Sequence, residues 1–173
     1  MANPTMSLIA SKVISTNTSS VAFSSIPNTY TDLKLIVSTR DNLSSGNSTA
    51  LTVFNSDTST NYTNVGMYIN GTSVSNLINS TSVSQFPWNV STSTTGANYV
   101  YTYGEMYIPN YNSTAGKPYI HLSTGEGTSS WIFLTAAGRY TGSSGITSIS
   151  LTPASGSSFV SGSSFYLYGI KNS

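Results

Sequence analysis

Hydrophobic and polar residues alternate with a period of two along most of this chain. The clearest case is the stretch 30–40, where Leu33, Leu35 and Val37 occupy every second position and polar residues fill most of the others. Since successive residues of a β-strand point to opposite faces of a sheet, this stretch predicts a strand with one apolar face. Ile36 breaks the alternation, which indicates that the second face of this strand is partly covered too.

Weaker copies of the pattern recur along the chain, at 8–14, 19–24, 51–54, 65–69, 97–109, 119–123, 148–151 and 165–170. The stretch 131–137 differs, because it is apolar at nearly every position and so predicts a central strand that is covered on both faces. Asn70-Gly71, placed between two alternating runs, predicts a tight hairpin. The stretch 75–97 is rich in Ser, Thr and Asn, and we expect it to be a long loop.

About nine or ten short strands, with turn residues every dozen or so positions, predict an all-β fold. The expected architecture is an antiparallel two-sheet β-sandwich, jelly-roll-like. Helical spacing does not extend over the ten or more residues that a helix needs. The 173 residues fit one domain, 1–173, whose first residues, 1–7, are expected to form an extended N-terminal arm.

Charged residues make up only 6% of the chain, against roughly 25% in ordinary soluble domains. The net charge is +1, and the six Lys and Arg residues are spread singly along the sequence. Nucleic-acid binding requires clustered cations, so we expect no nucleic-acid partner. Copies with so little charge repel one another weakly, which favours association into a homo-oligomer.

Groups that could carry out catalysis are few, since cysteine is absent and His121 is the single histidine. His121 lies in a predicted strand between apolar neighbours, a poor position for a general base. Glu105 and Glu126 could face each other as a glycosidase requires if their strands pair, but an ion pair or a solvated carboxylate is the more ordinary role for each. Calcium-loop and phosphate-loop spacings are missing from the sequence. We therefore expect no enzymatic activity, no cofactor and no metal.

A row of tyrosines supplies the first candidate interface. Tyr99, Tyr101, Tyr103 and Tyr107 fall on one face of the predicted strand 97–109. Tyrosine combines a flat apolar ring with a hydroxyl group, which suits protein interfaces and the stacking of sugars. The other interpretation is that the row faces the sandwich core or forms cross-strand pairs.

A second candidate lies in the expected loop 75–97, where Phe86 and Trp88 flank a proline. Aromatic side chains in such a loop commonly plug the end of a core. Trp is also enriched at the hot spots of interfaces. The pair therefore joins the tyrosine row as a candidate interface.

Three short segments share a distinctive composition: Ile26-Pro27-Asn28-Thr29-Tyr30-Thr31-Asp32-Leu33, Tyr107-Ile108-Pro109-Asn110-Tyr111 and Leu167-Tyr168-Gly169-Ile170-Lys171. Together they span most of the chain, and they resemble a recurrent type of tailed-phage virion protein. The resemblance implies a β-rich structural component of the head surface or the tail. It implies no catalytic residues.

From this resemblance we expect a capsid decoration (cement) protein that binds the head shell without catalysis. Its partners would be the major capsid protein or other virion proteins, and the head surface is favoured over the tail. The resemblance also favours a homotrimer. The alternative is a tail-fibre or receptor-binding module that recognises host surface glycans through Tyr and Trp.

The start of the chain lacks the basic and apolar regions of a secretory signal peptide. No apolar run approaches the roughly 20 residues needed to span a bilayer. We therefore expect a protein made in the host cytoplasm, with the virion as its final location and no membrane partner.

Overall fold

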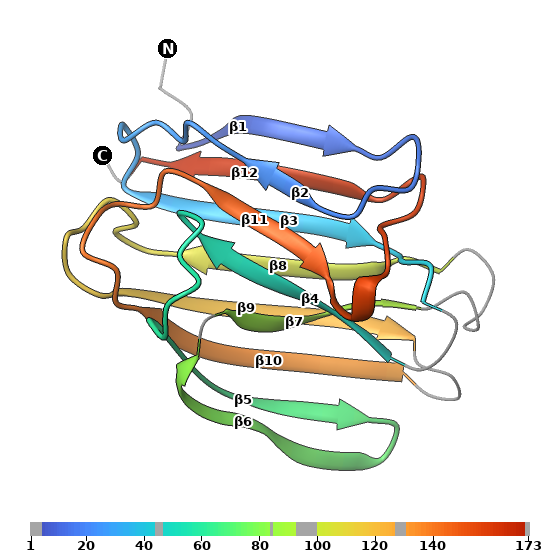
Figure 1. Ribbon diagram of the computed structural model, residues 1–173. Helices are drawn as coiled ribbons and strands as arrows, with labels where there is room; N and C mark the ends of the chain where they lie inside the picture. Colours follow the sequence, from blue (N-terminus) through green and yellow to red (C-terminus); the bar gives the residue numbers. More distant parts are fainter. Residues whose placement is uncertain (1–4, 44–46, 84, 93–99, 127–130, 172–173) are drawn as a thin grey trace.

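The computed structural model contains twelve β-strands in two antiparallel sheets that face each other (Figure 1). It describes residues 5–43, 47–83, 85–92, 100–126 and 131–171. For residue 47 and the stretches 76–83 and 86–92 it describes the course of the backbone alone. The predicted all-β sandwich is confirmed.

The larger sheet has eight strands in the order β1-β12-β3-β8-β9-β10-β5-β6. Their bounds are β1 (Met6–Val13), β12 (Ser164–Ile170), β3 (Asp32–Thr39), β8 (Thr102–Ile108), β9 (Lys117–Glu126), β10 (Trp131–Tyr140), β5 (Tyr62–Asn70) and β6 (Ser73–Val83). The smaller sheet has the order β2-β11-β4-β7. It consists of β2 (Val21–Phe23), β11 (Ile149–Pro153), β4 (Asn47–Phe54) and β7 (Phe86–Thr92), and a short 3-10 turn, η1 (Ala154–Gly156), follows β11.

Eight of these strands alternate between the sheets in the interleaved order of a jelly roll. In chain order, β1, β3, β8 and β12 belong to the large sheet, whereas β2, β4, β7 and β11 belong to the small one. Two further strand pairs, β5–β6 and β9–β10, extend the large sheet on one side (Figure 1). The large sheet is therefore twice as wide as the small sheet that packs on it.

The hydrophobic core fills the space between the two sheets. Leu33, Leu35 and Val37 are buried in it, as their alternation predicted. Leu35 lies between Leu167 of β12 and Met106 of β8 in the register of the sheet. The small sheet and its loops contribute Val21, Phe23, Phe54, Ile149, Leu151 and Phe159.

The stretch 75–97 is not the expected long loop, because β6 extends to Val83 and β7 covers 86–92. The remaining residues 93–97 lie outside the described part. Strand β6 forms an edge of the large sheet and β7 an edge of the small one. Strand β7 does carry apolar alternation, at Phe86, Trp88 and Val90, but the Ser, Thr and Asn residues around it favoured the prediction of a loop.

The predicted hairpin connects β5 and β6, although its turn is shifted by one residue. Asn70 pairs with Ser73, so Gly71 and Thr72 form the two-residue connection. Gly71 has a φ of 59°, as the first central residue of a type II′ turn requires. At the N-terminus, β1 begins at Met6, inside the stretch 1–7 expected to form an arm.

Candidate functional site

The two faces of the large sheet have different surroundings. One face packs on the small sheet; the other, here called the outer face, is left uncovered by the described part of the chain. Along β3 the alternation is regular, since Leu33, Leu35 and Val37 are buried while Lys34 and Ile36 are half-buried on the outer face. Directly paired residues of neighbouring strands share a face, so the register assigns the residues of the other strands to one side or the other.

Large hydrophobic side chains are concentrated on the outer face. By register it carries all nine that are exposed in the described part of the chain: Met6, Leu8, Val13, Val65, Met67, Val74, Tyr103, Ile120 and Trp131. Trp131 is 68% exposed, whereas its neighbour Ile132 is buried. The prediction that 131–137 is covered on both faces is therefore wrong for the single chain.

The structure divides the six aromatic candidates. Tyr103 and Tyr107 lie on the outer face of β8, and Tyr101 precedes this strand with its hydroxyl group 2.7 Å from the carbonyl oxygen of Ser161. Tyr99 lies outside the described residues. Phe86 and Trp88 belong to β7, in the other sheet, and their side chains are not described.

Two tyrosines that the sequence analysis did not name as candidates lie on the outer face near Tyr103 and Tyr107. Tyr166 and Tyr168 of β12 alternate with the buried Phe165 and Leu167, and Tyr168 is paired with Lys34. The alternation in this strand was visible in the sequence. The pairing that brings β12 beside β3 was not, because the two strands are far apart in the chain.

An ion pair lies in the middle of the tyrosine side of the outer face. Lys34 Nζ is 2.8 Å from Glu105 Oε2, and the Tyr103 hydroxyl group donates to the same oxygen at 2.8 Å. Lys34, and to a lesser extent Tyr103, lower the pKa of Glu105. Burial and the hydrogen bond to Glu105 raise the pKa of Tyr103 to about 12. The charges of the pair therefore compensate each other within the face, and Tyr103 stays neutral.

Tyr107 is also fixed as a neutral side chain. Its hydroxyl group donates to Asp32 Oδ2 at 2.5 Å, and the other oxygen of Asp32 accepts from the Asn110 backbone N–H at 2.9 Å. The hydrogen bond to Asp32 is the main reason why the pKa of Tyr107 rises to about 12. Tyr103 and Tyr107 therefore present neutral rings with oriented hydroxyl groups on the outer face.

The other side of the outer face is aliphatic and contains a shallow hollow of about 270 Å³. Its lining is Val65, Gly66, Met67, Ile120, Thr135, Ala136 and Ala137. The hollow arises because β10 carries the small residues Thr135 and Ala137 where its neighbours carry larger ones. Such a depression can accept a bulky apolar side chain from another molecule.

The structure places the residues considered for catalysis apart from one another. His121 is buried on the inner face of β9, and burial lowers its pKa to about 4. Glu105 is paired across the strands with Leu122, which places Glu126 about 13 Å further along the sheet. The described residues contain no group of three or more side chains that could hold a metal ion.

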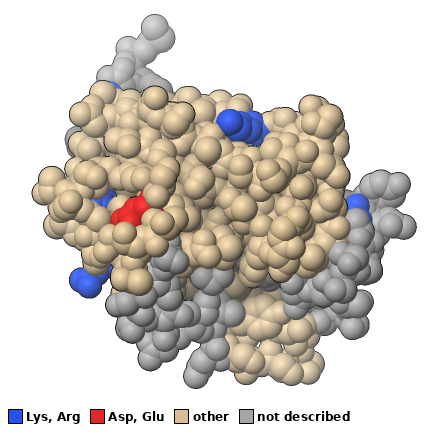
Figure 2. Space-filling model, in the orientation of Figure 1, with Lys and Arg blue, Asp and Glu red and all other residues tan. Residues whose placement is uncertain are grey.

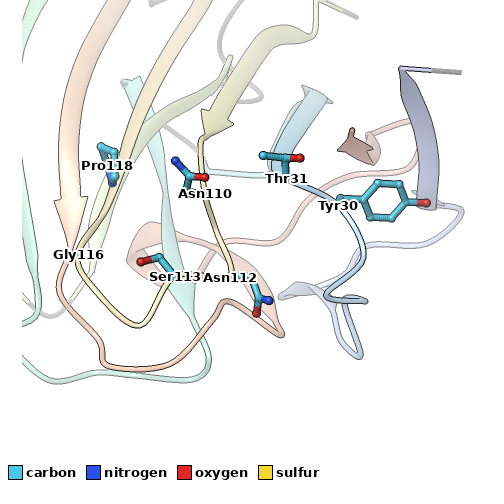
Figure 3. Close-up of a pocket in the computed structure, with 7 residues that line it drawn as sticks. All are labelled: Tyr30, Thr31, Asn110, Asn112, Ser113, Gly116 and Pro118. Atoms are coloured by element: carbon cyan, nitrogen blue, oxygen red, sulfur yellow. The ribbon is translucent and has the colours of Figure 1, made fainter. Parts of the chain in front are cut away.

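A second hollow, of about 530 Å³, lies beside the loops that precede β3 and β9 and follow β8 (Figure 3). It is lined by Tyr30, Thr31, Asn110, Asn112, Ser113, Gly116 and Pro118. Neutral amides and hydroxyl groups of this kind could hydrogen-bond a sugar. Figure 3 shows, however, that the Tyr30 ring points away from Asn110 and Ser113. The ring lies close to Gly169 and 5.8 Å from Lys171 Nζ, so it offers the hollow no stacking platform.

Comparison of the chain with family models, with curated proteins and with solved structures returned no match. The resemblance to phage virion proteins therefore stays a prediction. Among the described residues no helix is long and apolar enough to cross a membrane.

Proposed function

We propose that this chain is a non-catalytic structural protein of a tailed-phage virion, most simply a capsid decoration protein, and that its outer face binds another protein. The single observation that carries the adhesive role is the position of the nine exposed large hydrophobic side chains, all on one uncovered sheet face. The phage virion as the setting rests on the sequence resemblance.

The size of the outer face supports a binding role. Eight strands about 4.8 Å apart, with about eight residues each at about 3.3 Å, outline an area of roughly 1,000 Å². A face of this size is large enough for a standard protein interface, which takes about 800 Å² from each partner.

Charge supports the same function. On the side of the molecule seen in Figure 2, Lys, Arg, Asp and Glu form small separate spots on a surface made mostly of other residues. On the outer face, the Lys34–Glu105 pair compensates its own charge. Binding through the outer face would thus depend on apolar burial and neutral hydrogen bonds. The jelly-roll fold agrees with a virion component by analogy only, because it also serves lectins and other proteins.

A glycan-binding module of a tail fibre is the second candidate function. The amide and hydroxyl lining of the hollow beside Asn110 and Ser113 favours it. The orientation of Tyr30 speaks against it, since sugars in such sites stack on an aromatic ring and this ring is turned away. We therefore rank adhesion to protein first. The expected homotrimer stays a prediction.

A salt wash of purified particles tests the proposal. Ion-pair adhesion weakens as salt rises, since screening shortens to about 3 Å at about 1 M. We expect the protein to stay on the particle across that range and to leave only in denaturant, as followed by immunoblotting of pelleted particles. Release at moderate salt would show that charges such as Lys34 and Arg139 carry the attachment. Absence of the protein from particles would refute the virion setting.

A further inference from the structure

The pattern of strand β10 calls for a cover that the single chain does not provide. β10 is the sixth of eight strands in the large sheet, so it is an interior strand. Its inner residues Ile132 and Leu134 are buried, while Trp131 on the outer face is 68% exposed and Ala137 is exposed. A strand that is apolar on both faces is typical of a position between two packed layers. The outer side of β10 from Trp131 to Ala137 therefore resembles a buried layer in composition.

The residues along β10 are arranged so that the outer side of this strand complements itself. Thr135 lies at the centre of this row, with Ala137 two residues to one side and Phe133 two residues to the other. Ala137 lines the shallow hollow, and Phe133 carries a large half-buried ring. Consider a two-fold axis that lies between the two facing sheets and runs perpendicular to the strands at Thr135. It would bring Phe133 of one copy over the hollow of the other.

The residues at the two ends of this row, and the glutamate beside one end, also complement each other under the same axis. Arg139 lies four residues from Thr135 in one direction, and Trp131 lies four residues away in the other. Glu126 is paired directly with Trp131 on the neighbouring strand. The same two-fold axis places Arg139 of one copy near Trp131 and Glu126 of the other, where an ion pair and a cation–π contact are both available.

The dimensions of the face fit such a pairing. An axis that crosses the strands superposes the full width of both sheets, so most of the roughly 1,000 Å² outline can be covered. A standard interface needs about 800 Å² from each partner. Two identical twisted sheets pack face to face at about 30°, as the layers of a sandwich do. Copies with a net charge of +1 repel each other little.

We infer that a second copy of this chain covers the outer face, in a two-fold dimer whose axis crosses β10 at Thr135, and this dimer takes the place of the homotrimer expected from the resemblance. The inference rests on one part of the proposed function, namely that the outer face binds protein. It adds that the bound protein is a second copy of this chain. In the dimer the two large sheets form the central layers and the two small sheets lie outside. Each contact occurs twice, as an isologous interface requires.

Sedimentation equilibrium of the purified protein tests the inference, with two variants that carry the same change on opposite sides of the molecule. Ala137→Arg places a cation in the hollow of the outer face, whereas Ala22→Arg places one on the exposed side of β2 in the small sheet. We expect a dimer for the wild type and for Ala22→Arg. Ala137→Arg should raise the dissociation constant about 100-fold or more, since it would bury an unpaired charge. A wild-type monomer or trimer, or equal behaviour of the two variants, would refute the two-fold contact.

A charge exchange keeps the test valid if Ala137→Arg fails to fold. Arg139→Glu and Glu126→Arg are each expected to weaken the dimer about tenfold, because like charges then face each other across the axis. The double variant should regain most of the wild-type affinity; failure to regain it would refute the placement of the axis. Salt washing of particles separates the two hypotheses. A monomer that stays on the particle would refute the dimer alone, and a dimer that is absent from the particle would refute the virion role alone.

Discussion

The two faces of the large sheet use the same strands and nearly the same proportion of apolar residues, yet they have different surroundings. Leu35 and Ile36 are adjacent residues of similar size. Leu35 is fully buried between Leu167 and Met106, whereas Ile36 lies half-buried on the outer face. The inner face is buried and combines aliphatic and aromatic side chains with some buried polar ones such as Lys117 and His121. The outer face mixes half-buried and exposed apolar residues with tyrosine hydroxyl groups and an ion pair. This mixture is the chemistry of an interface between folded molecules and not of a folding core.

The largest expected effect comes from equal truncations on the two faces. Leu35→Ala should lower the free energy of unfolding by about 2–5 kcal/mol, because it leaves a cavity in the core. Ile36→Ala should lower it by less than about 1 kcal/mol, since the side chain is only half-buried in the single chain. Urea unfolding of the two variants at low protein concentration measures both values. Similar losses would mean that the outer face contributes to the core, and the distinction between the faces would fail.

Acid should destabilise the protein through the inner face, at His121. Burial lowers the pKa of His121 from 6.5 to about 4, so between these values the unfolded chain binds a proton that the folded chain does not. The free energy of unfolding should therefore fall as the pH drops from 6.5 towards 4, by about 3 kcal/mol in total. Urea unfolding at pH 7 and at pH 4.5 measures this loss.

The control for this prediction is His121→Leu, which removes the titrating ring and keeps an apolar side chain beside Met106 and Ala136. Asp57 and Glu105 have lowered pKa values, so the stability that they contribute is lost at lower pH. This loss is the same in both proteins and cancels from the comparison. The variant should lose less stability between pH 7 and pH 4.5 than the wild type. An identical acid loss in both would show that His121 is not the group responsible.

The smallest expected effect belongs to the ion pair of the outer face. Lys34 and Glu105 keep 29% and 28% of their side chains exposed, and such pairs contribute about 0.2–1 kcal/mol. Glu105→Gln should cost that much at low salt and less at about 1 M salt, where the charges are screened. Tyr103→Phe removes the neighbouring hydrogen bond without changing the charge, and its effect should not depend on salt. A salt-independent loss in Glu105→Gln would contradict an electrostatic role.

The sequence was sufficient to predict what depends on local alternation. Leu33, Leu35 and Val37 marked the core, and the spacing of strands and turns marked a sandwich. Strand β7 was missed although Phe86, Trp88 and Val90 alternate along it, because the stretch around it is rich in Ser, Thr and Asn and was interpreted as a loop. Only the start of β6 was predicted, as the return strand of the hairpin after Asn70-Gly71. The outer face could not be predicted, for a different reason. Lys34 lies between Tyr107 and Tyr168 only through long-range pairing of three strands, which no local pattern encodes.

The interleaved topology also has a consequence for how the chain acquires its structure during synthesis. β12 is the last of the twelve strands along the chain, yet it lies between β1 and β3, and its Phe165 and Leu167 are fully buried. Until β12 leaves the ribosome, the nascent sheet has a gap one strand wide, with the unpaired backbones of β1 and β3 on its two sides. Contacts between segments so distant in the chain form slowly, and open strand edges attract foreign strands in the meantime. Insertion of β12 closes both edges at once, so we expect the sheet to be completed late, in a single cooperative step.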